Sequence, residues 1–198
     1  MIIKKVKDSN ASVNAVVDRP EETVASVSDY YALREKWTKK AATPKLMRSA
    51  DAPLIMDGEQ KIKLLLSGEE SGGRFMVSLI TLEPDTGPPL HHQPNEDEMF
   101  LVVYGEIEVT IGNETQIVGQ GDFAYAPPNT SHAFRAAGGK PAAMFSINSP
   151  GGHERGFEYF TMMAEKGEPI ERAMAGLENY DFVINELDDE EANERIGV

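Results

Sequence analysis

From Lys45 to Asn148 the sequence consists of short segments in which apolar and polar residues alternate, and turn-forming residues separate one segment from the next. In segment 106–112, for example, Ile107 and Val109 share one face of an extended strand, while the intervening polar residues face the other way. Asp-Gly, Gly-Gly and Gly-Asn pairs mark the turns. About eight strands at this regular spacing predict an all-β domain, either a closed barrel or a jelly roll. The expected strands are 60–67, 74–82, 98–104, 106–112, 114–118, 122–126, 131–136 and 142–148.

The residues on both sides of this β-rich region follow a helical pattern. We expect a helix from Pro20 to about Ala42, with Trp37 packing it onto the barrel, and two helices after the barrel at roughly 153–165 and 168–179. A short strand is also expected at 1–6. The expected organisation is an N-terminal arm and helix at 1–50 that packs on the barrel or on a dimer partner, a barrel at 51–150, and a helical extension with an acidic tail at 151–198.

The composition excludes several classes of protein. The chain has no cysteine, so disulfides, thiolate metal ligands and cysteine nucleophiles are excluded. A net charge of −14 argues against nucleic-acid binding, and no apolar run is long enough for a membrane helix. The N-terminus lacks the apolar middle of a secretory signal, and we therefore expect a cytoplasmic protein.

The charge is unevenly distributed, because a mildly basic N-terminal arm precedes an acidic body. Solubility is one explanation of this asymmetry. The alternative is that the arm of one subunit docks on the acidic body of a second. On that interpretation we expect a homodimer.

Three histidines, one glutamine and one glutamate stand out as candidate metal ligands. His91 and Gln93 would project to the same side of an extended strand and His92 to the other, and Glu98 begins the next expected strand. His132 follows a Pro-Pro-Asn turn that folds the chain back along the barrel. Two imidazoles and a carboxylate with open positions are the ligand set of non-haem Fe(II) sites and also suit Mn, Ni, Co or Zn. We therefore expect one divalent metal ion on His91, Gln93, Glu98 and His132.

Other assignments of these polar residues stay open. If a β-bulge shifted the strand by one residue, His92 would point inward, and either His91 would be displaced or both histidines would bind. His153 lies beyond the expected barrel and is interpreted as a surface or packing residue. Glu96 and Asp97 are interpreted as solvated carboxylates of a turn. No residue is assigned a catalytic role.

The stretches that carry these residues resemble the two sequence motifs of the cupin family. The first motif, G-x5-H-x-H-x3-4-E-x6-G, is matched by His91, Glu98 and Gly105. The second motif, G-x5-P-x-G-x2-H-x3-N, is matched by Gly121, Pro127 and His132. The resemblance covers about residues 55–150, and the segment 149–160 is similar to the region after the barrel in quercetinase-like single-domain cupins.

The chain also departs from these motifs. Gln93 stands where the family has a second histidine, and its amide oxygen is a weaker ligand than imidazole. Asn129 replaces a glycine, and asparagine is one of the few residues that tolerate a left-handed conformation. Ala136 replaces an asparagine, so that polar contact is lost.

The resemblance implies a cupin double-stranded β-helix, or jelly-roll barrel, with a metal ion inside and apolar or aromatic side chains around it. Candidates for this substrate-pocket lining are Phe75, Phe100, Phe123, Tyr125, Phe134 and Met144. It also implies a metal-dependent enzyme acting on an aromatic or enolisable small molecule, with a quercetinase-like dioxygenase as the leading case. The alternatives are a non-redox isomerase or polyketide-type cyclase that uses the metal as a Lewis acid, and a cupin that binds a small molecule without turnover.

Overall fold

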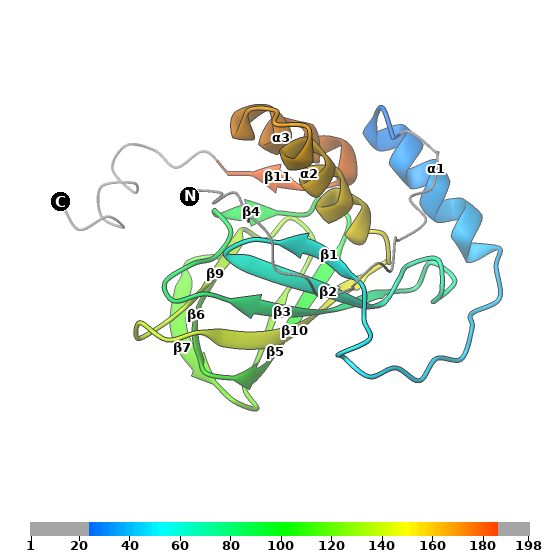
Figure 1. Ribbon diagram of the computed structural model, residues 1–198. Helices are drawn as coiled ribbons and strands as arrows, with labels where there is room; N and C mark the ends of the chain where they lie inside the picture. Colours follow the sequence, from blue (N-terminus) through cyan, green and yellow to red (C-terminus); the bar gives the residue numbers. More distant parts are fainter. Residues whose placement is uncertain (1–23, 186–198) are drawn as a thin grey trace.

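The computed structural model describes residues 24–185, which contain all the helices, strands and contacts given for this protein. The strand expected at 1–6 and the acidic tail at 186–198 lie outside the described residues. Two antiparallel β-sheets face each other in a jelly roll, and the helices gather near one end of it (Figure 1). The all-β fold predicted from the alternating segments is confirmed.

The sheets contain six and five strands. The strands are β1 Leu54–Asp57, β2 Gln60–Leu66, β3 Met76–Leu82, β4 His91–His92, β5 Asp97–Tyr104, β6 Glu106–Ile111, β7 Glu114–Gly119, β8 Phe123–Ala126, β9 His132–Ala136, β10 Ala142–Ser149 and β11 Val183–Ile184. The larger sheet has the order β1-β2-β3-β10-β5-β8, and the smaller one the order β11-β4-β9-β6-β7. The helices are α1 Val27–Thr38, α2 Glu154–Glu165, α3 Ile170–Gly176 and the 3-10 helix η1 Leu177–Tyr180.

All eight expected strands are present as β2, β3 and β5 to β10, with ends that differ from the prediction by at most two residues. The strands β1, β4 and β11 were not expected. Each is too short to show an alternating pattern, and β4 is a two-residue strand between prolines that interrupt the sequence signal.

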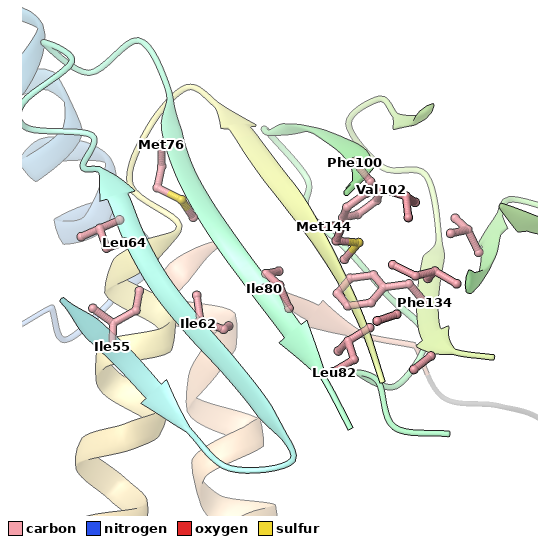
Figure 2. Close-up of a cluster of buried hydrophobic side chains, with 14 residues drawn as sticks. Ile55, Ile62, Leu64, Met76, Ile80, Leu82, Phe100, Val102, Phe134 and Met144 are labelled. Atoms are coloured by element: carbon pink, nitrogen blue, oxygen red, sulfur yellow. The ribbon is translucent and has the colours of Figure 1, made fainter. Parts of the chain in front are cut away.

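The hydrophobic core lies between the two sheets. Along β6 the predicted alternation is confirmed, since Ile107 and Val109 are buried. Phe100 from the larger sheet and Phe134 from the smaller one meet with ring centroids 5.1 Å apart, and Met144 lies beside them (Figure 2). Gly105 joins β5 to β6 with a φ of 73°, where a Cβ would lie 2.7 Å from the carbonyl oxygen of Pro141. The chain can therefore turn there only with glycine.

Helix α1 lies beside the barrel at the end where the other helices gather (Figure 1). It begins at Val27 because the side chain of Ser26 caps it, accepting a hydrogen bond from the backbone N–H of Asp29 over 3.2 Å. The helix is therefore shorter than the predicted segment. Trp37 is buried, and its ring lies so close to Gly68 that a Cβ at that glycine would come within 2.8 Å of it. Trp37 thus packs the helix against the loop that joins β2 to β3.

The C-terminal helices cover the same end of the barrel. Helix α2 packs on β1, and Thr161 donates a hydrogen bond to the carbonyl oxygen of Ile55 over 2.8 Å. Helix α3 and η1 pack on α2, and β11 then pairs with β4 beside the barrel opening. Within residues 24–185, no helix combines the length and apolar character that a membrane span requires.

Candidate metal centre

Three side chains from both sheets meet inside the covered end of the barrel. His91 in β4 and His132 in β9 are direct partners in the smaller sheet, so their side chains share a face. Glu98 comes from β5 of the larger sheet, opposite them. All three are buried, and their ligand atoms lie within 4.8 Å of one another. We refer to His91, Glu98 and His132 as the metal triad.

Backbone carbonyls orient both imidazoles of the metal triad. Nδ1 of His91 lies 2.9 Å from the oxygen of Pro89, and Nδ1 of His132 lies 2.8 Å from the oxygen of Thr130. A proton on each Nδ1 leaves each Nε2 with a free lone pair, which is the usual arrangement in metal-binding histidines. In that tautomer, Nε2 of His132 faces a carboxylate oxygen of Glu98 at 3.0 Å, and a cation would relieve the contact between two lone pairs. The residues therefore fit a divalent metal ion.

Glu98 is held by hydrogen bonds at both carboxylate oxygens. Ser146 donates to Oε1 over 2.8 Å, and the amide Nε2 of Gln93 donates to Oε2 over 3.0 Å. Oε2 is the same oxygen that Nε2 of His132 approaches. The carboxylate is consequently fixed with Oε2 toward the histidines.

The surroundings of the metal triad favour the protonation states that ligands need. Burial lowers the pKa of His91 to about 3, so this ring is neutral at physiological pH. Burial on its own would raise the pKa of Glu98, but a hydrogen bond that His132 donates when Nε2 carries a proton holds it well below its usual range, and a metal ion would take the place of that proton. A neutral imidazole and an ionised carboxylate are the forms that bind a metal.

Gln93 and His92 lie on opposite sides of the strand, as the regular register predicts. Gln93 is buried next to the metal triad, whereas the half-buried His92 places its Nδ1 2.8 Å from Oδ1 of Asn185. The pairing of His91 with His132 and of β4 with β11 shows no register shift, so the bulged alternative is not observed. Asn129 adopts a φ of 62°, and its backbone N–H donates to the oxygen of Gln93 over 2.9 Å.

An apolar cavity of about 90 Å³ adjoins the metal triad. Barrel residues Ile62, Ile80 and Phe134 line one side, and residues of the C-terminal cover, including Phe157 and Phe182, line the other. The ring of Phe182 stacks on His91, with centroids 4.2 Å apart and 15° between the planes. The polar groups that reach the cavity are those of Gln60, His91, Glu98 and His153.

The side chains proposed for the pocket lining occupy three different positions. Phe134 lines the cavity, whereas Phe100 and Met144 are buried deeper in the core between the sheets. Phe75, Phe123 and Tyr125 are 37%, 59% and 45% exposed and do not reach the cavity. Phe123 and Tyr125 pair with Leu101 and Met99, so in β8 alternation turns these aromatic side chains to the outer face of the sheet.

Two further polar residues, Glu96 and His153, are buried near the metal triad, and the sequence interpretation was wrong for Glu96. Glu96 is 1% exposed and accepts hydrogen bonds from Tyr30 and Arg34, so its assignment as a solvated turn carboxylate was wrong. His153 is buried against the cavity with Nδ1 3.1 Å from Glu96. The local sequence gives no signal for this arrangement, because its members come from segments more than fifty residues apart.

The region that is similar to known proteins contains the metal triad. The family model described as "Cupin domain" matches residues 78–148, which contain the whole metal triad. Quercetin 2,3-dioxygenase of Bacillus subtilis is 29% identical over 96 residues, which make up 48% of this chain and 28% of that enzyme. The similarity to this dioxygenase thus extends over about half of the present chain.

Two further comparisons span only part of the chain. Mannose-1-phosphate guanylyltransferase RfbM of Salmonella typhimurium is 32% identical over 82 residues, 40% of this chain and 17% of that protein. The chain thus spans only a minor part, 28% and 17%, of the two curated relatives. The solved structure of KdgF from Halomonas sp. matches with a TM-score of 0.49 at 19% identity, covering 55% of this chain and 94% of that chain.

Proposed function

Because residues 78–148 form a cupin domain, we propose that this chain is a metal-dependent enzyme that acts on a small enolisable or hydroxy-aromatic molecule, with oxidation by O2 as the leading reaction. The observation that carries the proposal is the metal triad in the wall of a buried apolar cavity. A concave apolar site with few convergent polar groups is the usual design of a small-molecule site. The similarity to a quercetin 2,3-dioxygenase supports an oxygen-dependent reaction.

The residues of the site have separate tasks in this proposal. His91, Glu98 and His132 would hold the metal ion, with Gln93 either orienting Glu98 or offering its amide oxygen as a fourth ligand. The ion would supply Lewis-acid polarisation of a carbonyl or enol oxygen, or redox chemistry with O2. The stacked ring of Phe182 excludes water from His91, which strengthens electrostatic interactions with a bound substrate.

The size of the cavity limits the substrate. Its volume is about 90 Å³, whereas an engineered protein cavity of about 150 Å³ admits benzene and ligand sites commonly measure about 300–1,000 Å³. A three-ring flavonol therefore does not fit unless the cover formed by η1 and the following residues moves away. The geometry favours a substrate of a few carbon atoms over the substrate named for the dioxygenase relative.

The experiment that tests this function begins with the metal content of protein purified without added metal. We expect one divalent ion per chain, and loss of that ion in the His91→Ala variant. O2 uptake is then measured with small β-diketones, α-hydroxyketones, catechol and, as an oversized control, quercetin. A protein that binds no divalent ion even after reconstitution would contradict the proposal.

The same experiment separates the alternative functions. Conversion of an enolisable compound without O2 uptake would indicate an isomerase or cyclase that uses the metal as a Lewis acid. Metal binding with no conversion of any compound would indicate a small-molecule-binding cupin.

A further inference from the structure

A second group of polar residues lies behind the cavity wall, on the side of the helical cover, and reaches the cavity through His153. Its centre is Glu96, which is buried and accepts hydrogen bonds at Oε1 from the hydroxyl of Tyr30 over 2.7 Å and from Arg34 over 3.0 Å. Oε2 lies 3.1 Å from Nδ1 of His153. We refer to Tyr30, Arg34, Glu96 and His153 as the Glu96 cluster.

Helix α1 is held closely against this cluster. Gly152, directly before His153, has a φ of 142°, and a Cβ there would lie 2.7 Å from the hydroxyl of Tyr30 and 3.0 Å from Cδ of Arg34. The contact between α1 and the start of α2 is thus made possible by a residue without a side chain. The helix brings Tyr30 and Arg34 to a carboxylate whose other side-chain partner among the described residues is His153.

The orientation of His153 follows from these contacts. Its Nδ1 is hydrogen-bonded to Glu96, and its ring packs edge-on against Phe157 with the ring centroids 4.8 Å apart. The side chain lines the same cavity as His91 and Glu98. Within residues 24–185, Nε2 of His153 takes part in no hydrogen bond. Because Nδ1 donates to Glu96, Nε2 carries a proton only in the imidazolium form, which the adjacent carboxylate stabilises. In that form the ring offers a free N–H group to the cavity.

We infer that His153 binds the substrate by donating a hydrogen bond from Nε2 to an anionic oxygen, and that the substrate is a small monoanion carrying a carboxylate or enolate group. This inference rests on the proposed function and names the substrate class of that site. Glu96, Arg34 and Tyr30 act through His153 as positioning residues. Because the other walls of the cavity are mainly apolar, a ligand oxygen there has few other partners.

The charges at the cavity favour an anion. Burial on its own would lower the pKa of His153, but the hydrogen bond to Glu96 and the charge of that carboxylate raise it above its ordinary value. Arg34 and a protonated His153 then outnumber the single negative charge of Glu96. The nearby Glu154 does not compensate while it is protonated, since burial raises its pKa to about 7. A divalent ion on the metal triad would also leave an excess of positive charge, because the carboxylate of Glu98 neutralises only part of the charge of the ion.

The test uses the full-length protein loaded with zinc, which has no redox chemistry, at pH 6.5. Acetate and the isosteric, uncharged acetamide serve as probes, and their dissociation constants are measured by calorimetric or NMR titration. We expect acetate to bind at least about tenfold more weakly to His153→Gln than to the wild type, because a charge-assisted hydrogen bond is lost. Acetamide binding should change little, zinc content should stay the same, and His92→Gln should match the wild type.

A small β-diketone, titrated in the same way, distinguishes enolate from carboxylate as the preferred anion. Equal acetate affinity of the wild type and His153→Gln at equal zinc content would overturn the inference, and so would a wild type that binds neither probe. If His153→Gln does not fold, Glu96→Gln takes its place and must weaken acetate binding. If the wild type holds no zinc, the proposed function fails, and the same comparison on metal-free protein still decides the role of His153.

Discussion

The amide of Gln93 donates a hydrogen bond from Nε2 to Oε2 of Glu98 over 3.0 Å, at the place where the cupin motif has a histidine. In this arrangement the amide oxygen points away from the carboxylate. To ligate a metal ion the amide would have to rotate, and Glu98 would then lose that donor. Gln93 can therefore orient the carboxylate ligand or act as a ligand, but it cannot do both at once.

Replacement of Gln93 by histidine tests this relationship. Gln93→His should tighten the binding of zinc, nickel or cobalt, because imidazole nitrogen suits these ions better than an amide oxygen does. Each tenfold gain corresponds to about 1.4 kcal/mol, which competition with a chelator resolves. Gln93→Ala should weaken binding by about tenfold if the amide only orients Glu98. Unchanged affinity in both variants would show that this position does not influence the metal.

The two neighbouring histidines of β4 should behave differently. His91→Ala and His132→Ala remove members of the metal triad and should abolish stoichiometric metal binding, as measured by elemental analysis after dialysis. His92→Ala is the matched control, since that ring lies on the opposite side of the strand and contacts Asn185. Loss of metal in His92→Ala with retention in His91→Ala would reverse our assignment of the inward face.

Sequence reasoning succeeded where a residue's position depends on its neighbours in the chain. In strand β6 apolar and polar residues alternate because one face is buried, and this period of two is visible in the sequence. The same rule places His91 and Gln93 on one side of β4 and His92 on the other. Gly105 and Asn129 were predictable at their turns, because few residues adopt a positive φ.

Sequence reasoning failed where a position depends on segments distant in the chain. The burial of Glu96 requires Tyr30 and Arg34 from α1 and His153 from the start of α2. The cavity is closed by Phe182, which follows three helical segments and stacks on His91. Aromatic residues of β8 were expected inside, but alternation alone does not tell which face of a strand is the inner one.

The cover over the cavity can be tested at Phe182. Phe182→Ala removes a buried ring that stacks on His91 and should lower the free energy of unfolding by about 3 kcal/mol. The exposed Phe123 is the control, and Phe123→Ala should change stability by no more than about 0.5 kcal/mol. Chemical denaturation measures both. Phe182→Ala should also bind phenol more tightly than the wild type does, because the cavity is larger, and equal phenol affinity of the two proteins would contradict the closed cavity.

The buried carboxyl of Glu154 should make stability depend on pH. Its Oε1 accepts a hydrogen bond from the backbone N–H of Gly68 over 2.7 Å, whereas Oε2 has no partner among the described residues. Burial raises the pKa of Glu154 from 4.5 to about 7, and the nearby Glu158 and Glu96 act in the same direction. The native protein therefore keeps this proton over a pH range in which the unfolded chain has lost it.

Between pH 4.5 and about 7 the native state binds more protons at Glu154 than the unfolded state does, so the free energy of unfolding falls as the pH rises and levels off above that range. The whole decrease attributable to this residue is about 3 kcal/mol. Glu154→Gln does not titrate, and its stability relative to the wild type should therefore rise by that amount between pH 4.5 and 8 in urea denaturation experiments. Glu114→Gln, in the exposed edge strand β7, should keep the wild-type dependence. Parallel pH profiles of Glu154→Gln and the wild type would mean that Glu154 is ionised in the native protein throughout this range.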